Sequence, residues 1–552
     1  GAIMNEPKTE ADFFIIDGGI GAINMVNDTN YTFKGKILVE LQGFTGPYYP
    51  KKNYDFDIVN DDLIEYDTVL LDLPSENDFI LKAEYLDLSL MKNALTYEMA
   101  RRMGRYAPRT KYCELMVNGE YMGVYSLTEK IKRDDNRVDI AQLNPEDISG
   151  EELTGGYIFE INENGTPNDW ESDYLPINYA SCGLPVAYKM VYPRIEEIQP
   201  EQLDYIVAYV DSFEDALYGP DFLDTATGYR NYIAVKSFID FMLVNEFSSN
   251  YDSYGRSTFL YKDKNGEINI GPAWDYDRGY APWDVSGWVW ENTHPAWPFP
   301  FWWSKFREDE EWRDAVYCRY TNLRATVLTD EAFDVFIDSV AAYIGEAATR
   351  NFEKWPELYV TDPPYFVEEL RTFVHDRLNW IDIQMADDFV PAPDASFDIN
   401  SLGALTYQFT PVTTGATYLW NFGDGFTSEE FTPNHTFSGP GDFLVSLTVN
   451  KNYGCIGTSS ELYKVNVSVN DKSMLGLQVY PSPAEHTVSV SLNTNSTIDL
   501  IEIFTLEGSA LNLPLTQTGN NVIINLDGIA VGTYLLKIYS GNNCINYPIV
   551  KM

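Results

Sequence analysis

The sequence predicts a multidomain protein in which a large α+β region precedes two smaller all-β sandwich domains. A chain of 552 residues is too long for one compact core. The stretch DFVPAPDAS (388–396) has the proline and small-residue content of a linker, and helical periodicity disappears after it. Short alternating strands then follow between turn clusters such as NFGDG and SGPGD, and VNDKSM (469–474) marks a further boundary. We expect domains over residues 8–390, 394–470 and 475–552.

The first region begins with an amphipathic helix and a hairpin. Residues 88–104 (LSLMKNALTYEMARRMG) place apolar side chains on one helical face, with Ser89 as the expected N-cap and Gly104 as the expected stop. Residues 112–130 contain alternating apolar residues on both sides of Asn118-Gly119, which is a strong signal for a hairpin turn. Helix-like and strand-like stretches therefore alternate, as in an α+β domain.

A second helix leads into a loop and a further hairpin. Residues 231–247 (NYIAVKSFIDFMLVNEF) have apolar side chains at helical spacing. A loop with Asp252 follows, and then a hairpin that turns at residues 264–266 and whose far strand is expected to end at Asp275. A loop aspartate, a tight hairpin and a second aspartate also occur in this order in protein kinases, as catalytic base and metal ligand.

The stretch GPAWDYDRGY (271–280) raises a question of charge. If it is a strand, Asp275 and Asp277 lie on one face and Trp274 and Tyr276 on the other. Two like charges on one face repel, so a cation lies between them or one carboxylate takes up a proton. A divalent metal with oxygen ligands is the usual cation. The alternative is a surface strand with both aspartates in solvent.

The charge balance limits the partners. The formal net charge is −45, from 83 acidic and 38 basic residues, and such a surface repels phosphate backbones and anionic lipid. We therefore expect no nucleic-acid partner. Hydrophobic residues make up 45% of the chain, enough for folded cores. No apolar run approaches the roughly 18 residues of a membrane-spanning helix.

Cysteine and histidine give no metal site. The five cysteines have an odd total and no C-x-x-C spacing, so they predict neither a zinc site nor a dense disulfide framework, and no pairing can be assigned. The four histidines are dispersed along the chain. A metal site in this protein would therefore use carboxylates.

Most of residues 35–385 resembles the CotH family, atypical protein kinases related to spore coat protein H. The stretches that carry the resemblance include GKILVELQGFTGPYYPKKNYDFD, LLDLPSENDFILKAEYLD, LMKNALTYEMARRMGRYAPRTKYCELMVNGEYMGVYSLTEK, TGGYIFEIN and NEFSSNYDSYGRSTFLYKDKNGEINIGPAWDYD. The resemblance implies a bilobal, protein-kinase-like fold with ATP between a mostly β lobe and a helical lobe. It implies Asp252 as the catalytic acid and Asp275 as the metal ligand, with Asp277 as a second ligand for Mg²⁺ or Mn²⁺.

Further site residues follow from the same resemblance. Lys51 and Lys52 lie in the family's KK-x-Y segment and Glu129 ends a hairpin strand, so all three are expected to bind the nucleotide. For the lysine pair, a solvated surface is the alternative. Two positions depart from the pattern: Gln42 stands where many relatives have arginine, and Ser257 stands where kinases place an asparagine that binds a second metal. These departures leave open a pseudokinase that has lost phosphotransfer.

The two carboxyl-terminal domains also resemble known families. YLWNFGDG (418–425) and GDFLVSLTV (441–449) are similar to a PKD domain, with Trp420 as the buried anchor. Residues 475–552, which open with LQVYPSPAEHTVSVSL, resemble the carboxyl-terminal sorting domain of type IX secretion. This resemblance implies a secreted or surface-attached protein, and so an amino-terminal signal peptide that is missing from this sequence.

The leading hypothesis is a secreted or cell-surface CotH-type kinase that transfers the γ-phosphoryl group of ATP to serine or threonine of an extracytoplasmic protein. Because ATP is scarce outside cells, two alternatives stay open. One is a non-catalytic surface protein that binds polysaccharide or protein through the tryptophan-rich segment 283–303, whose simpler explanation is core packing. The other is a structural module in which the aspartates hold Ca²⁺. The oligomeric state is not indicated by the sequence.

Overall fold

The computed structural model forms two compact units, Gly1–Ala392 with Asn452–Cys455, and Pro393–Lys451 with Ile456–Met552. The residues that the structure describes are 3–19, 21–43, 46–161, 170–281, 286–291, 297–388, 393–403, 405–451, 455–465, 476–492, 497–506, 508–541 and 543–552. The α+β character of the first unit and the all-β character of the second confirm the coarse prediction.

The first unit begins with a six-stranded antiparallel sheet in the order β1-β2-β3-β4-β6-β5. Its apolar face includes Phe56, Ile58 and Phe79, which are fully buried. The strands are β1 (Thr9–Ile15), β2 (Phe33–Leu41), β3 (Tyr54–Val59), β4 (Asp78–Lys82), β5 (Thr110–Val117) and β6 (Glu120–Glu129). The predicted turn at Asn118-Gly119 joins β5 to β6, and both residues have the positive φ angles (51° and 82°) that such a turn requires.

A second, five-stranded sheet has the order β11-β10-β7-β9-β8. Its strands are β7 (Tyr157–Ile161), β8 (Trp170–Glu171), β9 (Ala187–Tyr192), β10 (Thr258–Lys262) and β11 (Ile268–Ile270). The predicted turn at residues 264–266 joins β10 to β11, which confirms this hairpin.

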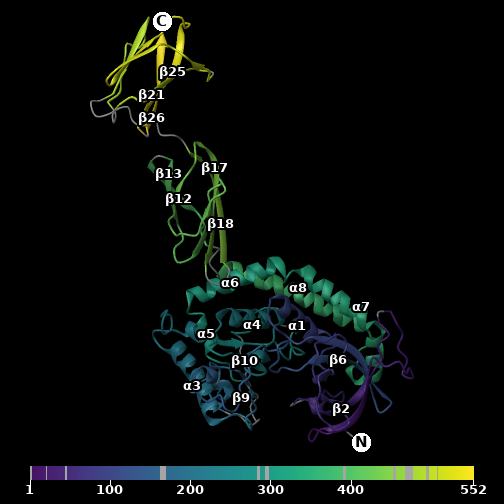
Figure 1. Ribbon diagram of the computed structural model, residues 1–552. Helices are drawn as coiled ribbons and strands as arrows, with labels where there is room; N and C mark the ends of the chain where they lie inside the picture. Colours follow the sequence, from purple (N-terminus) through teal and green to yellow (C-terminus); the bar gives the residue numbers. More distant parts are fainter. Residues whose placement is uncertain are drawn as a thin grey trace. The chain divides into compact units, whose positions relative to one another are not determined.

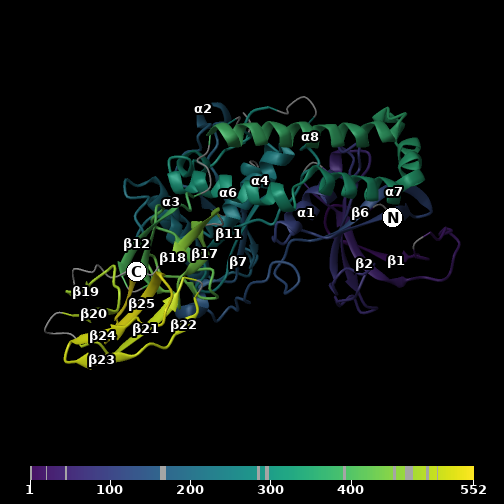
Figure 2. The same cartoon turned by 90° about the horizontal axis from the view of Figure 1, so that it is seen from above.

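The first unit has a larger hydrophobic core to which its helices contribute most of the residues, and a separate core on the six-stranded sheet. They are α1 (Lys92–Arg102), α2 (Tyr179–Cys182), α3 (Pro200–Tyr218), α4 (Val235–Ser248), α5 (Trp302–Phe306), α6 (Glu310–Thr326), α7 (Asp330–Lys354) and α8 (Pro363–Asp388). Short 3₁₀ turns are η1 (Gly46–Tyr48), η2 (Gly150–Thr154), η3 (Tyr229–Asn231), η4 (Asp252–Tyr254) and η5 (Pro356–Leu358). Figures 1 and 2 show α7 and α8 side by side, and α7 also packs on α1 and β6.

Helix α1 ends as predicted but begins differently. Gly104 follows the helix with φ 87°, a conformation that glycine adopts without strain. At the other end, Ser89 is not the N-cap: Met91 occupies that position, and the Asp87 carboxylate accepts the N–H of Lys92 (2.7 Å). The Ser89 hydroxyl donates to the same carboxylate instead of to the helix. The Asp87 carboxylate thus takes the capping role expected of Ser89.

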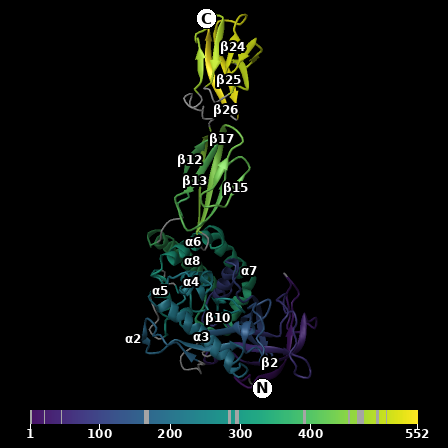
Figure 3. The ribbon, with the colours of Figure 1, turned by 60° about the vertical axis from the view of Figure 1, so that its left-hand side comes forward.

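The second unit contains two β-sandwiches. The first packs the sheet β12-β13-β16 against β15-β14-β17-β18, and Figure 3 separates β12 and β13 from β15. Trp420 is completely buried in its core, as predicted. The second packs β19-β20-β24-β23 against β22-β21-β25-β26.

The strands of the first sandwich are β12 (Phe397–Gly403), β13 (Thr406–Pro411), β14 (Thr417–Asn421), β15 (Thr427–Ser428), β16 (Asn434–Thr436), β17 (Gly441–Lys451) and β18 (Cys455–Val465). Those of the second are β19 (Gln478–Tyr480), β20 (Thr487–Ser491), β21 (Leu500–Thr505), β22 (Ala510–Leu511), β23 (Leu515–Thr518), β24 (Asn521–Asn525), β25 (Gly532–Ser540) and β26 (Asn543–Lys551).

One disulfide joins Cys318 of α6 to Cys455, with the two Cα atoms 4.8 Å apart. Cys113, Cys182 and Cys544 are free thiols. Across the described residues, no helix combines the length and the apolar character needed to span a membrane.

Candidate active site

The chain that carries Asp275 and Asp277 is a turn and not the continuation of a strand. β11 ends at Ile270, and Asp275 has a left-handed backbone with φ 65°. Because the turn breaks the two-residue alternation, Trp274 and Asp275 both reach the ammonium group of Lys82. The prediction that the strand extends to Asp275 is therefore wrong.

Helix α1 holds this turn through its backbone amides. The Asp275 N–H donates to the Tyr97 hydroxyl (3.3 Å), and the Tyr276 N–H donates to Asn93 Oδ1 (2.7 Å). Asn93 and Tyr97 are four positions apart, so they lie on the same face of the helix. These bonds restrain the backbone on both sides of the Asp275 carboxylate.

Asn250 connects the loop of Asp252 to the same turn. The chain leaves α4 through Ser249, which has φ 50°, and reaches Asp252 at the start of η4. The Asn250 side chain accepts the N–H of Asp252 on Oδ1 (3.4 Å) and donates through Nδ2 to the carbonyl oxygen of Asp275 (3.3 Å). One amide therefore bridges the two chain segments that carry the predicted catalytic and metal-binding aspartates.

Arg278 and Gly279 bring the turn close to the loop. Burial by itself would lower the pKa of Arg278, but the negative charges of Asp252 and Asp277 raise it above its ordinary value. A Cβ atom at Gly279 would lie 2.9 Å from the carbonyl oxygen of Ser248, so the close approach requires glycine. Arg278 thus lies near enough to the acids of the loop and of the turn for both charges to act on it.

Lys82 is a further residue of the site that sequence reasoning missed. Its Nζ lies 3.3 Å from Asp275 Oδ1 and 4.1 Å from the centre of the Trp274 ring. Burial alone would lower the pKa of Lys82, but Tyr97, Asp275 and Glu84 raise it above its ordinary value, so the side chain carries a charge. The signal that could have found it is a lone lysine in the apolar strand FILKA, because a buried ammonium needs an anionic partner.

The carboxyl groups of the site differ in their affinity for a proton. Burial, together with the negative charge of Asp275, raises the pKa of Asp277 to about 7. Burial also raises the pKa of Glu84, whose carboxylate accepts bonds from Ser126 (2.7 Å) and Asn93 (2.9 Å). The structure thus answers the question of charge: a lysine lies beside one aspartate of the pair, and the other has a raised pKa.

The predicted Lys51 and Lys52 lie in the connection between β2 and β3. Lys51 is buried, and its ammonium donates to the carbonyl oxygens of Ala83 (2.6 Å) and Val124 and to Asn351 Oδ1 (2.9 Å). Burial lowers the pKa of Lys51 to about 7. Lys52 is half-buried. The described contacts join Lys51 to α7 and to Ala83, which lies between the site residues Lys82 and Glu84; none of them joins it to the turn of Asp275.

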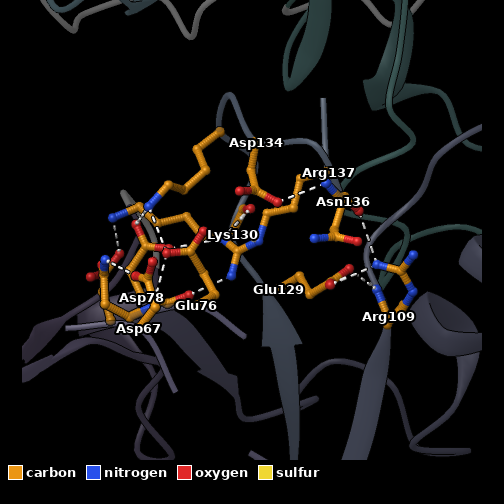
Figure 4. Close-up of polar contacts among 12 residues, drawn as sticks. Asp67, Glu76, Asp78, Arg109, Glu129, Lys130, Asp134, Asn136 and Arg137 are labelled. Atoms are coloured by element: carbon orange, nitrogen blue, oxygen red, sulfur yellow. Dashed lines mark hydrogen bonds and ion pairs between the residues drawn. The ribbon is translucent and has the colours of Figure 1, made fainter. Parts of the chain in front are cut away.

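Glu129 belongs to a network of ion pairs at the end of β6. Its Oε1 lies 2.8 Å from Arg109 Nη1, and its Oε2 accepts the Arg109 N–H at 2.8 Å. Figure 4 shows Arg109 facing Glu129, with Arg137 and Asp78 nearby, and the latter two are also paired at 2.8 Å. The Glu129 carboxylate is therefore engaged within the protein, and its role toward a nucleotide stays a prediction.

The tryptophan-rich segment forms core and one contact to the site. The Trp297 indole donates to Asp252 Oδ1 (3.1 Å), while Trp283 lies outside the described residues. The other four tryptophans of the segment are buried, so they do not form the exposed aromatic platform considered as an alternative. Their burial confirms the prediction of core packing. The buried residues are Trp288, Trp290, Trp302 and Trp303.

Comparison with known proteins identifies three segments in the expected order. Residues 39–381 match the CotH kinase protein family, residues 394–473 match the PKD domain, and residues 478–551 match the secretion system C-terminal sorting domain. No curated protein matches the chain.

The solved structures described next each match a part of the chain. The PKD1 domains of Vibrio anguillarum Epp and of the Vibrio cholerae metalloprotease PrtV are 31% and 32% identical to it; each match covers 14% of this chain, and 95% and 99% of those domains, with TM-scores of 0.13. Dimeric latent PorU from Porphyromonas gingivalis is 13% identical over 31% of this chain and 21% of its own, also with a TM-score of 0.13.

The sorting domain indicates a secreted or cell-surface protein. The family match over residues 39–381 spans more than half of the sequence and includes every residue of the turn and the loop described above. The chain belongs to the CotH kinase protein family.

Proposed function

We propose that the protein is a kinase that acts outside the cytoplasm, transferring the γ-phosphoryl group of ATP to serine or threonine of a secreted or surface protein. Its first unit would then be a kinase-like pair of lobes, with the six-stranded sheet as one lobe. The observation that carries the proposal is the bridge made by Asn250, which joins the loop of Asp252 to the turn of Asp275. Protein kinases likewise combine a catalytic base on one loop with a metal-binding aspartate on another segment.

The donor set of the turn suits Mg²⁺ or Mn²⁺ bound together with a nucleotide. Across the described residues, no group of three or more histidine, cysteine, aspartate or glutamate side chains could hold a metal ion. Mg²⁺ is commonly held by one or two carboxylates plus substrate phosphates, whereas Ca²⁺ takes six to eight oxygen ligands. Asp275 and Asp277 meet the first requirement, and the raised pKa of Asp277 is the property that a nearby divalent cation would reverse. This favours a nucleotide-dependent metal over a structural Ca²⁺.

The residues of the chain then have distinct roles. Asp252 would orient the acceptor hydroxyl and take its proton as the oxygen bonds to the γ-phosphorus and the bond to the leaving ADP breaks. Lys82 would neutralise phosphate charge next to Asp275, a role for which its retained positive charge suits it. A metal ion bound at Asp275 and Asp277 would supply further charge neutralisation. The nucleotide contacts predicted for Lys51, Lys52 and Glu129 remain part of the proposal.

The decisive experiment is transfer of label from γ-³²P-ATP with Mn²⁺ or Mg²⁺ to the protein itself or to a generic acceptor protein. We expect Asp252→Asn to abolish transfer while ATP still raises the melting temperature, because this residue acts on the acceptor. Asp275→Asn should abolish both, because it holds the metal. By mass action, ATP at about 100 times its dissociation constant stabilises the folded protein by roughly 2.7 kcal/mol, which gives an easily measured rise in melting temperature.

Asp135→Asn is the matched control, because Asp135 is exposed and lies outside the site. Equal transfer by Asp252→Asn and wild type would refute the assigned base. No labelling and no thermal shift with any metal would refute the kinase. Stabilisation by Ca²⁺ alone, lost in Asp275→Asn, would instead support the structural-metal alternative.

A further inference from the structure

A cavity of about 160 Å³ lies behind the turn of the candidate site. We call it the α4 cavity. Its wall includes Ala100 of α1, Asp240 and Val244 of α4, Tyr261 of β10, Arg105, and the segment Gly271–Ala273. None of the site residues Lys82, Asp252, Asp275 and Asp277 lines it, so it is distinct from the site of proposed phosphoryl transfer.

The size and the walls suit one small ring. An apolar cavity of about 150 Å³ is enough to hold benzene in a protein core. Most of the exposed wall here is apolar, and the residues that line it include Ala100, Val244 and Ala273. An apolar group of this size would be removed from water, which is the main favourable term in small-molecule binding.

The polar end of the cavity is a guanidinium group. Arg105 Nε donates to Asp240 Oδ2 (2.7 Å), and Arg319 Nε donates to the other oxygen, Oδ1 (2.6 Å). Two arginines therefore share one carboxylate, and the group of three keeps a net positive charge. In the described part of the chain, the Nη atoms of Arg105 make no hydrogen bond, so they can serve a ligand.

The other charged groups on the cavity wall should act on a ligand less strongly than Arg105. Arg137 lines the cavity but its guanidinium is paired with Asp78 (2.8 Å). Asp139 is the other acid on the wall, and it is exposed, so solvent screens its charge. The neighbouring Tyr261 lies close enough to Arg105 for the positive charge to act on its hydroxyl. The local balance thus favours an anion over a cation.

We propose that the α4 cavity binds a small monocarboxylate with a single aromatic ring or a short branched aliphatic chain. The apolar part lies against Ala100 and Val244, and the carboxylate receives two hydrogen bonds from the Nη groups of Arg105, a geometry that the planar guanidinium favours. The same wall includes Gly271–Ala273, whose next residues are Trp274 and Asp275. Occupancy therefore restrains the backbone that leads into the candidate active site.

Titration calorimetry of the full chain with benzoate tests the proposal, with benzyl alcohol and benzylamine as the neutral and cationic probes. We expect saturable binding of benzoate at millimolar concentration or below and at least tenfold weaker binding of the other two. No benzoate binding, or equal binding of benzyl alcohol, would overturn the proposal. Preferred binding of benzylamine would show that Asp139 governs the site and would also overturn it.

Two variants separate the charge from the space. Arg105→Gln should weaken the binding of benzoate at least tenfold. Because Asp240 stays paired with Arg319, the buried carboxylate keeps a partner and the variant should fold. Val244→Phe should fill the cavity and abolish binding with Arg105 intact. Arg350→Gln, a change at an exposed arginine paired with Glu114, is the matched control and should bind as wild type. Undiminished binding in either of the first two variants would refute the location.

Hydrogen exchange supplies a readout that does not depend on activity. Benzoate should slow exchange in the peptide that covers residues 268–276, because the ligand contacts Gly271–Ala273. Protection elsewhere with none in this peptide would contradict the proposed cavity. Since neither measurement uses ATP, failure here and failure of the proposed kinase activity are distinguishable.

Discussion

Glu214 of α3 is a buried acid whose neutral form the fold prefers. Its carboxyl group accepts hydrogen bonds from Ser172 (2.7 Å), the Trp302 indole (2.8 Å) and Tyr188 (3.1 Å). These donors favour the ionised form, yet burial outweighs them and raises the pKa of Glu214 from 4.5 to about 7. Among the described residues, no cation hydrogen-bonds to this acid, so only three neutral donors stabilise its ionised form.

The consequence is a loss of stability as the pH rises. Between pH 4.5 and about 7 the unfolded chain has lost this proton while the folded protein keeps it, so the free energy of unfolding falls across that window. Below the window both states are protonated, and above it both are ionised. A change in pKa from 4.5 to about 7 corresponds to a loss of about 3 kcal/mol.

Glu214→Gln tests this, because glutamine imitates the neutral acid at every pH. We expect the variant to match wild type near pH 4.5 and to exceed its free energy of unfolding by up to about 3 kcal/mol at pH 8. Urea unfolding of the first unit, followed by tryptophan fluorescence at pH 4.5, 6 and 8, measures the difference. Glu196→Gln, at an exposed glutamate, should leave the pH profile unchanged. A constant difference between Glu214→Gln and wild type at all three pH values would refute the argument.

Three further outcomes are expected. Arg377→Met should lower the free energy of unfolding by about 3–5 kcal/mol in urea titrations, because it leaves the buried carboxylate of Glu246 without its ion-pair partner (3.1 Å). Gly279→Ala should abolish ATP-dependent labelling in the transfer assay, because its Cβ would push the turn away from Ser248. Denatured protein without reductant should take up three equivalents of an alkylating agent, and five after reduction, as counted by intact mass.

Each of these has its own control. The double change Arg377→Met with Glu246→Gln removes both charges and should recover part of the lost stability; no recovery would contradict the ion-pair argument. Gly439→Ala, where a Cβ meets no other atom within 4 Å, should retain labelling. Five alkylated thiols before reduction would exclude the Cys318–Cys455 disulfide.

Local sequence signals were enough to predict helices and hairpins of the first unit, but not to predict Lys82 as a residue of the site. The turns at Asn118-Gly119 and at residues 264–266 were predictable, because a tight hairpin requires residues that tolerate positive φ. Asp252 and Asp275 were predicted from their order along the chain together with the resemblance to the CotH family. Lys82 was not, because it reaches Asp275 from another strand 193 positions away, and no local periodicity carries that information.

The detail of the turn was also beyond sequence reasoning. The alternation of apolar and acidic residues over 273–277 favoured a longer strand, although Gly271-Pro272 directly after β11 is a local signal that ends one. Beyond the strand, α1 takes the amides of Asp275 and Tyr276 through Tyr97 and Asn93. These tertiary hydrogen bonds, which the local pattern does not contain, fix the conformation of the turn.

The contact of Lys51 with Asn351 limits how this protein can be dissected. The lysine lies between β2 and β3 with its ammonium buried against the six-stranded sheet, while the asparagine belongs to α7, 300 positions later. A fragment that stops before α7 would keep the ammonium in the interior but lose one of its three oxygen acceptors and the helix that covers it. Such an excised sheet should be insoluble or unfolded. During synthesis, the amino-terminal strands should therefore fold stably only after α7 has been translated.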